Sequence, residues 1–369
     1  MHLRFCLISF FLCILFLQSG NAQVDSIFDQ GSYRTFIVHL PAGYNENTDY
    51  PIVLNLHGLG STGFEQYLYS EFHLEADEKG FIVVYPDAIN NSWDLFGDFD
   101  VTFLTHLIDT LRERYSTTDC LFSMGMSQGG FLSYKLTCEL PYEISAIASV
   151  TGNMITPWQA SCTGTDPTPV MQFHGTADAV VPYNGTFGIP PVEETIDWWV
   201  NENDCSASPD YIAYPDIDPN DGSTAESFSY TNCDEESNVV FYKITGGGHS
   251  WPGAIAIPAF GSTNQDIHAS SMIADFFEEY CQPTTGVVSF EKSSIRVYPN
   301  PAQHSFTVDV PDTYFTLNVY DCTGRKMLAD VQVFDGTEID CSEWMNGMFF
   351  VHVVTDQGIS FSQLMIKTW

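Results

Sequence analysis

The chain has 369 residues, and its 12 Lys and Arg against 47 Asp and Glu give a formal net charge of −35. A hydrophobic fraction of 44% is enough for packed cores and excludes a disordered chain. Phosphate backbones and anionic lipids repel so acidic a protein, which excludes nucleic acid as a partner and favours uncharged substrates. The length allows roughly two domains.

Residues 1–22 have the pattern of a secretory signal peptide. Arg4 precedes an apolar run over residues 5–17, and the small residues Gly20 and Ala22 offer a cleavage point. The run is too short to span a bilayer comfortably, and no later segment is long and apolar enough. We therefore expect no transmembrane segment in the mature chain. An uncleaved N-terminal anchor is the alternative.

The cysteine count points to disulfide bonds. Two of the ten cysteines lie in the predicted signal peptide, and an even number remains in an exported chain. Cys120 and Cys138 lie in apolar stretches, where they are either disulfide partners or free core thiols. Two other pairs are close in the sequence, one around a polar loop and one within the terminal segment. The pairs that we predict are Cys205–Cys233 and Cys322–Cys341.

From residue 32 to residue 280, short apolar runs alternate with amphipathic stretches. This alternation predicts a doubly wound, mostly parallel sheet with helices on both faces, and residues 33–40 are expected to form an antiparallel edge. The predicted strands are residues 51–56, 81–85, 120–124, 144–150, 169–173 and 239–245. The predicted helices are residues 64–79, 101–111, 128–139, 191–203 and 268–280.

Residues 202–238 are rich in Asp, Glu, Ser, Pro and Asn, and we interpret them as a long surface excursion. Within them, residues 216–222 superficially resemble a calcium loop. Such a loop needs Gly at its sixth position and Glu at its twelfth, where this chain has Asp221 and Ser227. A solvated acidic turn is therefore our interpretation. We predict no metal site and no cofactor, because five histidines lack ligand spacing with one another: His73, His106, His268, His304 and His352.

After residue 282 the pattern changes. Residues 283–292 have the composition of a linker, and residues 293–369 contain short β-like segments separated by turn residues. We predict a small, sandwich-like all-β C-terminal domain after a catalytic domain over residues 23–282. The C-terminal segment holds no constellation of residues that indicates catalysis.

Gly125-Met126-Ser127-Gln128-Gly129-Gly130 follows an apolar strand and opens a predicted helix. A serine on a sharp strand-to-helix turn is exposed above the strand ends, and small neighbours let the strand and the helix approach there. This context predicts that Ser127 is a nucleophile. The alternative is a glycine-rich turn without chemical consequence.

A serine nucleophile needs a base and an acid that orients the base. Asp178 lies after the strand at residues 169–173, and His249 follows the strand at residues 239–245 and three glycines. The chain order Ser, Asp, His is that of the α/β-hydrolase fold, in which each residue follows the carboxyl end of a strand. We predict His249 as the base and Asp178 as the orienting acid.

The oxyanion needs two donors, for which we predict the backbone N–H groups of Gln128 and Leu59. His57 and His174 are interpreted as structural, since one triad already accounts for the base. Tryptophans at the same end of the sheet either stack on a substrate ring or pack loops onto the core. These candidate substrate-binding residues are Trp93, Trp158 and Trp251.

Together, these motifs make the first part of the chain similar to a known protein family. Residues 32–280 resemble the secreted esterase family that includes polyhydroxybutyrate depolymerases and feruloyl or acetylxylan esterases. The resemblance implies the same roles for Ser127, Asp178 and His249. Depolymerases often carry Cys after the early His-Gly, where this chain has Leu59; this difference keeps the backbone donor but weakens a prediction of polyester specificity. The matching segments are residues 33–41, 56–58, 80–87, 93, 125–130, 174–183 and 247–253.

Residues 297–301, 346–351 and 365–367 resemble the sorting domain recognised by type IX secretion. The usual final lysine is followed here by Thr368 and Trp369. The resemblance implies the type IX machinery as a partner. It also implies passage across the outer membrane, followed by release or surface attachment.

The sequence therefore predicts an exported serine esterase that forms an acyl-enzyme on Ser127. Feruloyl or acetyl esters of plant polysaccharide and polyhydroxyalkanoate polyester all remain candidate substrates. The alternatives are a serine peptidase on the same scaffold and a noncatalytic carbohydrate-binding or adhesion protein. We expect three loops to shape the substrate pocket: residues 88–100, 154–168 and 182–192.

Overall fold

The computed structural model describes residues 22–140, 143–162, 167–281, 296–309, 314–321, 325–334, 336–355 and 360–368. The chain divides into two compact units between Cys281 and Gln282. The predicted linker and all but the last residue of the predicted signal peptide lie outside the described residues. No helix in the described part of the chain is both long and apolar enough to cross a membrane.

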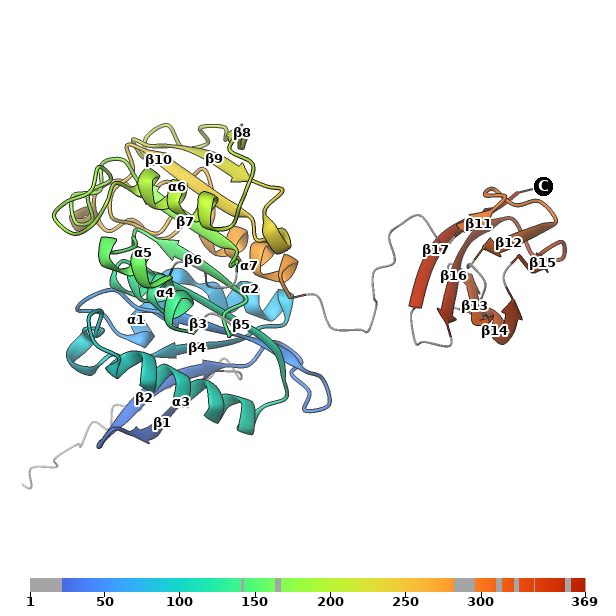
Figure 1. Ribbon diagram of the computed structural model, residues 1–369, viewed down its shortest axis with the longest axis horizontal. Coiled ribbons are helices and arrows are strands. Elements are labelled where there is room, and N and C mark those ends of the chain that lie inside the picture. Colours follow the sequence, from blue (N-terminus) through green and yellow to red (C-terminus); the bar gives the residue numbers. More distant parts are fainter. Residues whose placement is uncertain are drawn as a thin grey trace, which may run out of the picture. The chain divides into compact units, whose positions relative to one another are not determined.

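The first unit is built on one sheet of ten strands (Figure 1), in the order β1-β2-β4-β3-β5-β6-β7-β10-β9-β8. The six strands from β4 to β10 in that order run parallel, and an antiparallel pair continues the sheet at each edge. The strands are β1 (Ala22–Asp29), β2 (Ser32–His39), β3 (Tyr50–Leu56), β4 (Ile82–Pro86), β5 (Thr117–Met126), β6 (Ala146–Val150), β7 (Val170–Gly175), β8 (Asp210–Ala213), β9 (Thr224–Tyr230) and β10 (Val239–Thr245).

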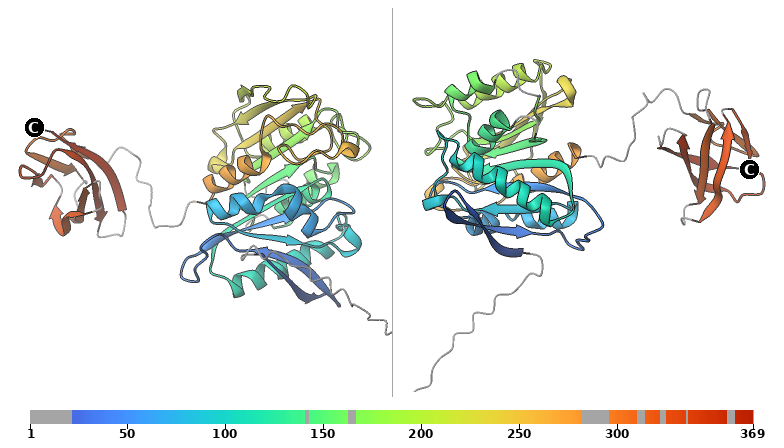
Figure 2. Two further views of the ribbon diagram at one scale, coloured as in Figure 1. Left: turned by 180° about the vertical axis from the view of Figure 1, so that it is seen from behind. Right: turned by 60° about the horizontal axis from the view of Figure 1, so that its bottom comes forward.

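Helices cover both faces of this sheet (Figure 2). The central strands are buried on both sides, and alternate residues of β3 point to opposite faces: Leu54 belongs to the core shared with α3, α4 and α6, whereas Val53 belongs to the core shared with α2 and α7. The helices are α1 (Gly63–Ser70), α2 (Phe72–Lys79), α3 (Phe99–Arg114), α4 (Gln128–Glu139), α5 (Thr156–Cys162), α6 (Val192–Glu202) and α7 (Ala269–Glu279). The predicted α/β fold is confirmed.

Two local predictions need correction. The single helix expected over residues 64–79 is interrupted at Glu71, whose φ of 48° is left-handed and ends α1 before α2 begins. Residues 202–238 are not only a loop, because they contain the β8–β9 hairpin. Ala225 and Ser227 alternate inward in β9, and the small polar residues of this strand hide its period-two pattern. Two acids of residues 216–222 accept hydrogen bonds from their own loop: Asp218 from Asn220 N and Asp221 from Ser223 N.

The second unit is all-β, as predicted. Its strands form a three-stranded sheet, β11-β12-β15, and a four-stranded sheet, β14-β13-β16-β17. Phe306 from the first sheet and Phe315 from the second belong to one buried core, so the sheets pack face to face. The strands are β11 (Arg296–Tyr298), β12 (Ser305–Asp309), β13 (Tyr314–Asp321), β14 (Lys326–Phe334), β15 (Glu338–Asp340), β16 (Gly347–Thr355) and β17 (Ser360–Lys367).

Three disulfide bonds lie in the first unit. The predicted Cys205–Cys233 pair is confirmed. Cys120 and Cys138 are not free thiols, because they pair with Cys281 and Cys162 respectively. Cys341 is buried without a disulfide partner among the described residues, and Cys322, its expected partner, lies outside them.

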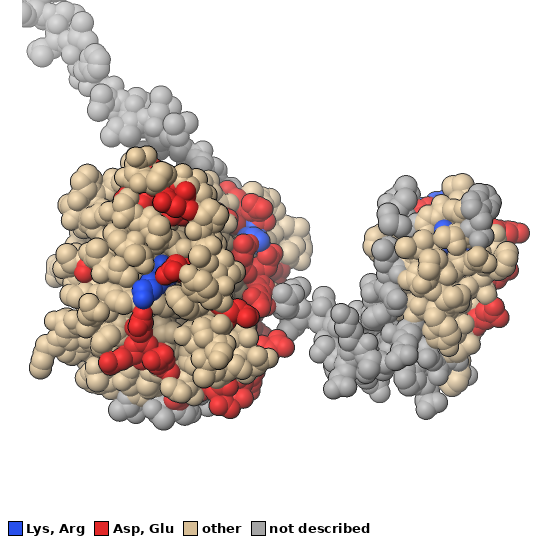
Figure 3. Space-filling model, turned by 90° about the horizontal axis from the view of Figure 1, so that it is seen from above, with Lys and Arg blue, Asp and Glu red and all other residues tan. Residues whose placement is uncertain are grey.

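The charged surface matches the composition. On the face seen in Figure 3, Asp and Glu far outnumber Lys and Arg. Several of the bases are held in ion pairs with acids, as Lys79 is with Asp275 and Glu278. Little positive surface is left for an anionic partner.

Candidate active site

Ser127 stands between the end of β5 and the first residue of α4. Its φ of 53° and ψ of −118° are strained for a residue with a side chain. Ser127 N donates to Val150 O at 2.8 Å, which holds the turn against β6. A Cβ atom on Gly129 would lie 2.1 Å from Leu56 O, and one on Gly125 would lie 2.6 Å from the same oxygen. Only glycine therefore lets α4 approach the sheet closely enough to form this turn.

Asp178 and His249 meet at the carboxyl ends of the adjacent strands β7 and β10. His249 Nδ1 lies 2.8 Å from Asp178 Oδ2, and both residues are buried. The other carboxylate oxygen accepts hydrogen bonds from Val180 N and Val181 N, each at 2.8 Å. Because a carboxylate only accepts, His249 Nδ1 carries a proton and Nε2 is left as the basic nitrogen.

Glycine brings these two loops together. A Cβ atom on Gly175 would lie 2.2 Å from Gly247 O, so the loops after β7 and β10 touch backbone to backbone. Ala177 N donates to Gly247 O at 2.9 Å, and Gly246 N donates to Thr176 Oγ1 at 2.9 Å. The Asp178–His249 hydrogen bond is thus supported by backbone contacts on both sides.

His174 is structural, as expected. Its Nε2 donates to Val181 O at 2.9 Å, and its Nδ1 accepts from Gln172 Nε2 at 3.1 Å. Complete burial lowers the pKa of His174, so the ring is neutral and the 3.6 Å approach of its Nε2 to Asp178 is not an ion pair. Gln172, which the sequence analysis did not single out, fixes the tautomer. Gln172 and His174 are the two polar side chains of the otherwise apolar strand β7, and their spacing of two residues is the signal that marks Gln172.

The segment that begins with His57 lies directly against the nucleophile. A Cβ atom on Gly58 would be 3.4 Å from Ser127 Cβ. His57 Nδ1 donates to Gly58 O at 2.7 Å, and His57 Nε2 accepts from Ala88 N at 3.0 Å, so this histidine is structural as well. Burial lowers the pKa of His57 and keeps its ring neutral.

The two predicted oxyanion donors flank Ser127. Leu59 follows Gly58, and the Gly58 carbonyl is held by His57 Nδ1 and by Ser61 N. Gln128 opens α4, and the first N–H groups of a helix have no partner within it. The Gln128 side chain has a role of its own: it accepts from Trp93 N at 2.9 Å and donates to Trp93 O at 3.1 Å.

Two of the three candidate tryptophans, Trp93 and Trp251, are placed for packing rather than for stacking on a substrate. Trp93 is buried, and its Nε1 donates to His57 O at 2.8 Å. Trp251 is buried as well, and its Nε1 donates to Ser270 Oγ at 3.1 Å. Trp158 packs behind the cavity wall against Phe131 and its neighbours. The substrate-stacking prediction is wrong for Trp93 and Trp251, because no face of either ring is open to a ligand.

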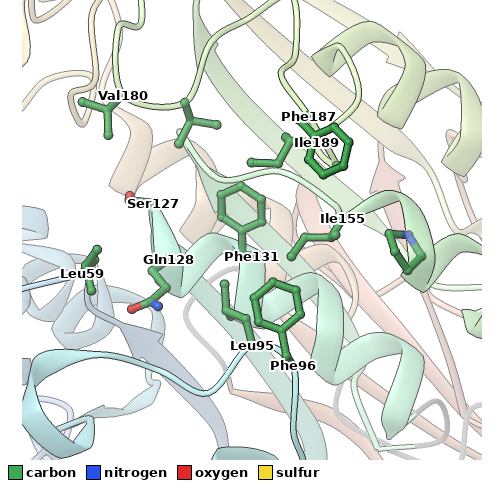
Figure 4. A pocket seen from close by; sticks show the side chains of 13 residues that line it. Leu59, Leu95, Phe96, Ser127, Gln128, Phe131, Ile155, Val180, Phe187 and Ile189 are labelled. Carbon is green, nitrogen blue, oxygen red and sulfur yellow. The ribbon is translucent and has the colours of Figure 1, made fainter.

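An apolar cavity of about 530 Å³ opens beside Ser127 (Figure 4). Of the described residues that line it, Ser127 and Gln128 alone carry polar side chains. Phe131 from α4 lies among the other lining side chains. The three loops expected to shape the pocket do supply its wall, through Leu95 and Phe96, Ile155 and Pro157, and Phe187 and Ile189. The sequence analysis had not named any of these side chains.

Known proteins resemble both units. Residues 100–189 match the family described as phospholipase/carboxylesterase, and residues 296–367 match the secretion system C-terminal sorting domain. Feruloyl esterase D of Neurospora crassa is 28% identical over 249 residues, covering 63% of this chain and 79% of the relative. The putative esterase NocK of Nocardia uniformis subsp. tsuyamanensis is 26% identical over 254 residues, covering 61% of this chain and 73% of the relative.

Two acetylxylan esterases extend the comparison. The bifunctional acetylxylan esterase/xylanase XynS20E of Neocallimastix patriciarum is 28% identical over 228 residues, covering 60% of this chain but 32% of that larger protein. The solved acetyl xylan esterase of Aspergillus awamori superposes with a TM-score of 0.52 at 15% identity, covering 71% of this chain and all of that one. The latter likeness shows a shared fold.

Fold and site define a serine hydrolase of the α/β-hydrolase class. Within that class, its similarity to carboxylesterases and to feruloyl and acetylxylan esterases shows a carboxylic ester hydrolase. At its C-terminus it carries a type IX secretion sorting domain, so it is an exported enzyme.

Proposed function

We propose that this enzyme hydrolyses carboxylic esters through an acyl-enzyme on Ser127, with His249 as general base and Asp178 as the acid that orients it. The observation that carries the proposal is the 2.8 Å hydrogen bond from His249 Nδ1 to Asp178 Oδ2. In the neutral tautomer that this bond selects, Nε2 is the nitrogen that can accept a proton, and His249 follows β10 at the same edge of the sheet as the Ser127 turn after β5.

The reaction proceeds in two halves. His249 Nε2 takes the Ser127 hydroxyl proton while Oγ forms a bond to the ester carbonyl carbon. The resulting oxyanion is bound by the N–H groups of Gln128 and Leu59. The intermediate collapses, the carbon–oxygen bond to the alcohol breaks, and His249 protonates the departing oxygen. Water, deprotonated by His249, then releases the carboxylic acid and restores Ser127.

The cavity takes the acyl group. The leaving oxygen must lie beside the histidine that protonates it, and His249 is not among the described residues that line the cavity. An apolar wall without charge favours an uncharged, apolar acyl chain. A volume of about 530 Å³ is far larger than an acetyl group needs, so we assign a phenylpropenoyl group such as feruloyl as the preferred acyl group. The activity in the name of the Neurospora relative supports this choice.

The test uses the mature enzyme with methyl ferulate, acetylated xylan and short-chain polyhydroxybutyrate. We expect the highest kcat/KM with methyl ferulate, and a loss of about 1,000-fold or more in Ser127→Ala. Ser127→Ala should also escape labelling by a fluorophosphonate that labels the wild type. Retained turnover in Ser127→Ala would refute the nucleophile, and a preference for acetylated xylan or polyhydroxybutyrate would refute the acyl assignment.

The sorting domain determines where this reaction takes place. We propose that the enzyme acts outside the cell, attached to the outer surface or released from it, on esters of plant polysaccharide that cannot enter. Fractionation of the producing cells should place the activity in the surface or culture fractions. Activity confined to the cell interior would contradict this location.

A further inference from the structure

One wall of the cavity is a short loop in which Leu95 packs against the core and Phe96 does not. Leu95 and Phe96 line the cavity from this loop, and the Phe96 side chain is 85% exposed. Apolar packing therefore does not fix Phe96 in place. The hydrogen bonds of the loop therefore act together with the packing of Leu95 to set its position.

Those contacts begin with Asp94, whose carboxylate closes the turn. Asp94 Oδ1 accepts from Gly97 N at 2.8 Å and from Phe96 N at 3.2 Å. Such Asx turns fix the backbone that follows them. On the far side of the loop, Lys135 Nζ, which is buried, donates to Gly97 O.

The backbone of the Asp94 turn is hydrogen-bonded to a buried side chain of the core. Asp94 N donates to Asp100 Oδ2 at 2.6 Å, and Asp100 lies buried in the first turn of α3. Its other oxygen, Oδ1, is 2.6 Å from Arg34 Nη2, and that guanidinium also donates to Asp87 O at 3.2 Å. The Arg34 guanidinium lies 3.7 Å from the centroid of the Phe103 ring. These contacts form one chain from β2 to the lip of the cavity.

A buried ion pair contributes little net stability, because desolvation of both charges offsets their attraction. Arg34 and Asp100 are each 2% exposed. Such a pair does fix the orientation of the carboxylate: with Oδ1 held by Arg34, the second oxygen of Asp100 accepts from Asp94 N.

We propose that Arg34, Asp100 and Asp94 form a positioning relay that sets the acyl selectivity of the enzyme by holding Leu95 and Phe96 against the cavity. The inference rests on the proposed function for its kinetic consequence. None of the three residues lines the cavity, so they act through the loop. A wall displaced by about 1 Å would weaken binding of a large acyl group far more than binding of a small one.

The kinetic test compares p-nitrophenyl cinnamate with p-nitrophenyl acetate, which share a leaving group. In Asp94→Ala and in Arg34→Lys, the ratio of kcat/KM for cinnamate to that for acetate should fall about tenfold, with the change in KM rather than in kcat. Asp94→Asn keeps the accepting oxygen and should restore the ratio. Arg112→Met removes an exposed ion pair with Glu143 at the other end of α3, and should leave both esters unaffected.

Amide hydrogen exchange provides a readout that needs no catalysis. Arg34→Lys should speed exchange at residues 93–98, although Arg34 lies in a different element, and Arg112→Met should not. Unchanged exchange there in Arg34→Lys would overturn the relay, whatever the kinetics. An unchanged cinnamate-to-acetate ratio in an active Asp94→Ala would overturn its role in selectivity. A wild type inactive on both esters would instead refute the proposed function.

Discussion

The active site has a polar half, which consists of Ser127, Asp178 and His249, and an apolar half, which is the cavity beside Ser127. The two halves differ in how their side chains are held in place. The Asp178 carboxylate accepts three hydrogen bonds at 2.8 Å, and the loops around it touch backbone to backbone. In the cavity, Phe187 is fully exposed and Phe96 nearly so. The geometry for bond breaking is thus built into strand ends and glycines, whereas the fit to the acyl group depends on loop side chains. Substitutions in the two halves should therefore have different kinetic signatures.

The largest effect is expected in the polar half. Asp178→Asn should lower kcat by about 10,000-fold, because an amide that donates to His249 Nδ1 stabilises the wrong tautomer of the imidazole. Turnover of p-nitrophenyl acetate measures this loss. Asp119→Asn, at an exposed site, is the matched control and should keep full activity. A loss below tenfold in Asp178→Asn would mean that the carboxylate does not orient the base.

Second, the Cys138–Cys162 disulfide tests whether the apolar half depends on covalent support. It ties the end of α5 to α4, and Pro157 in α5 lines the cavity. Replacing both cysteines by Ser should lower the free energy of unfolding by about 3 kcal/mol, from the loop that the bond closes. Chemical denaturation measures this change. The KM for cinnamate should rise as well.

The Cys205–Cys233 bond is the control for that experiment. It closes a loop of similar length, with a sequence separation of 28 against 24. The segment between Cys138 and Cys162 contributes Ile155 and Pro157 to the cavity wall, whereas no described lining residue comes from residues 205–233. Its removal should give a similar loss of stability with an unchanged KM. Equal changes of KM in both double variants would show that the effect on substrate binding is global.

A smaller effect is expected at the rim of the cavity. Phe187→Ala removes an exposed ring, so the free energy of unfolding should not change, whereas the KM for cinnamate should rise about fivefold from lost apolar contact. Phe28→Ala removes an exposed ring from β1 and should leave KM unchanged. An unchanged KM in Phe187→Ala would place the acyl group elsewhere.

The smallest effect concerns pH. Burial lowers the pKa of His57 and His174, so the unfolded chain binds protons there that the folded chain does not. The contribution of these two histidines to the free energy of unfolding is therefore fully present above about pH 6.5 and is lost as the pH falls below it. Denaturation at pH 7.5 and 5.5 measures this slope. His174→Gln should reduce the slope and exposed His304→Gln should not, whereas equal slopes in all three proteins would contradict the assignment.

The sequence predicted the polar half better than the apolar half, for physical reasons. Ser127, Asp178 and His249 each follow an apolar strand, and the glycines beside Ser127 and before His249 mark the close approaches that these turns require. Phe96 and Phe187 come from loops without periodicity, so their direction depends on tertiary contacts such as those of Asp94.

Burial was the other property that the sequence left open. Trp93 and Trp251 were candidates for stacking on a substrate because they lie at the correct end of the sheet, but they fill the core beneath it. The sequence does not reveal that Cys138 and Cys162 are partners. They lie near the ends of α4 and α5, which β6 separates in the sequence, so only the folded sheet brings them together.

The Cys120–Cys281 bond has a mechanical consequence. Cys281 is the last described residue before the C-terminal unit, and Cys120 belongs to β5, in the interior of the sheet. Tension transmitted from the C-terminal unit therefore reaches the middle of the sheet through a covalent bond before it can peel α7 away. When such an enzyme is pulled through its C-terminal unit, the sheet that carries the active site stays folded, provided that the Cys120–Cys281 bond has formed before the force is applied.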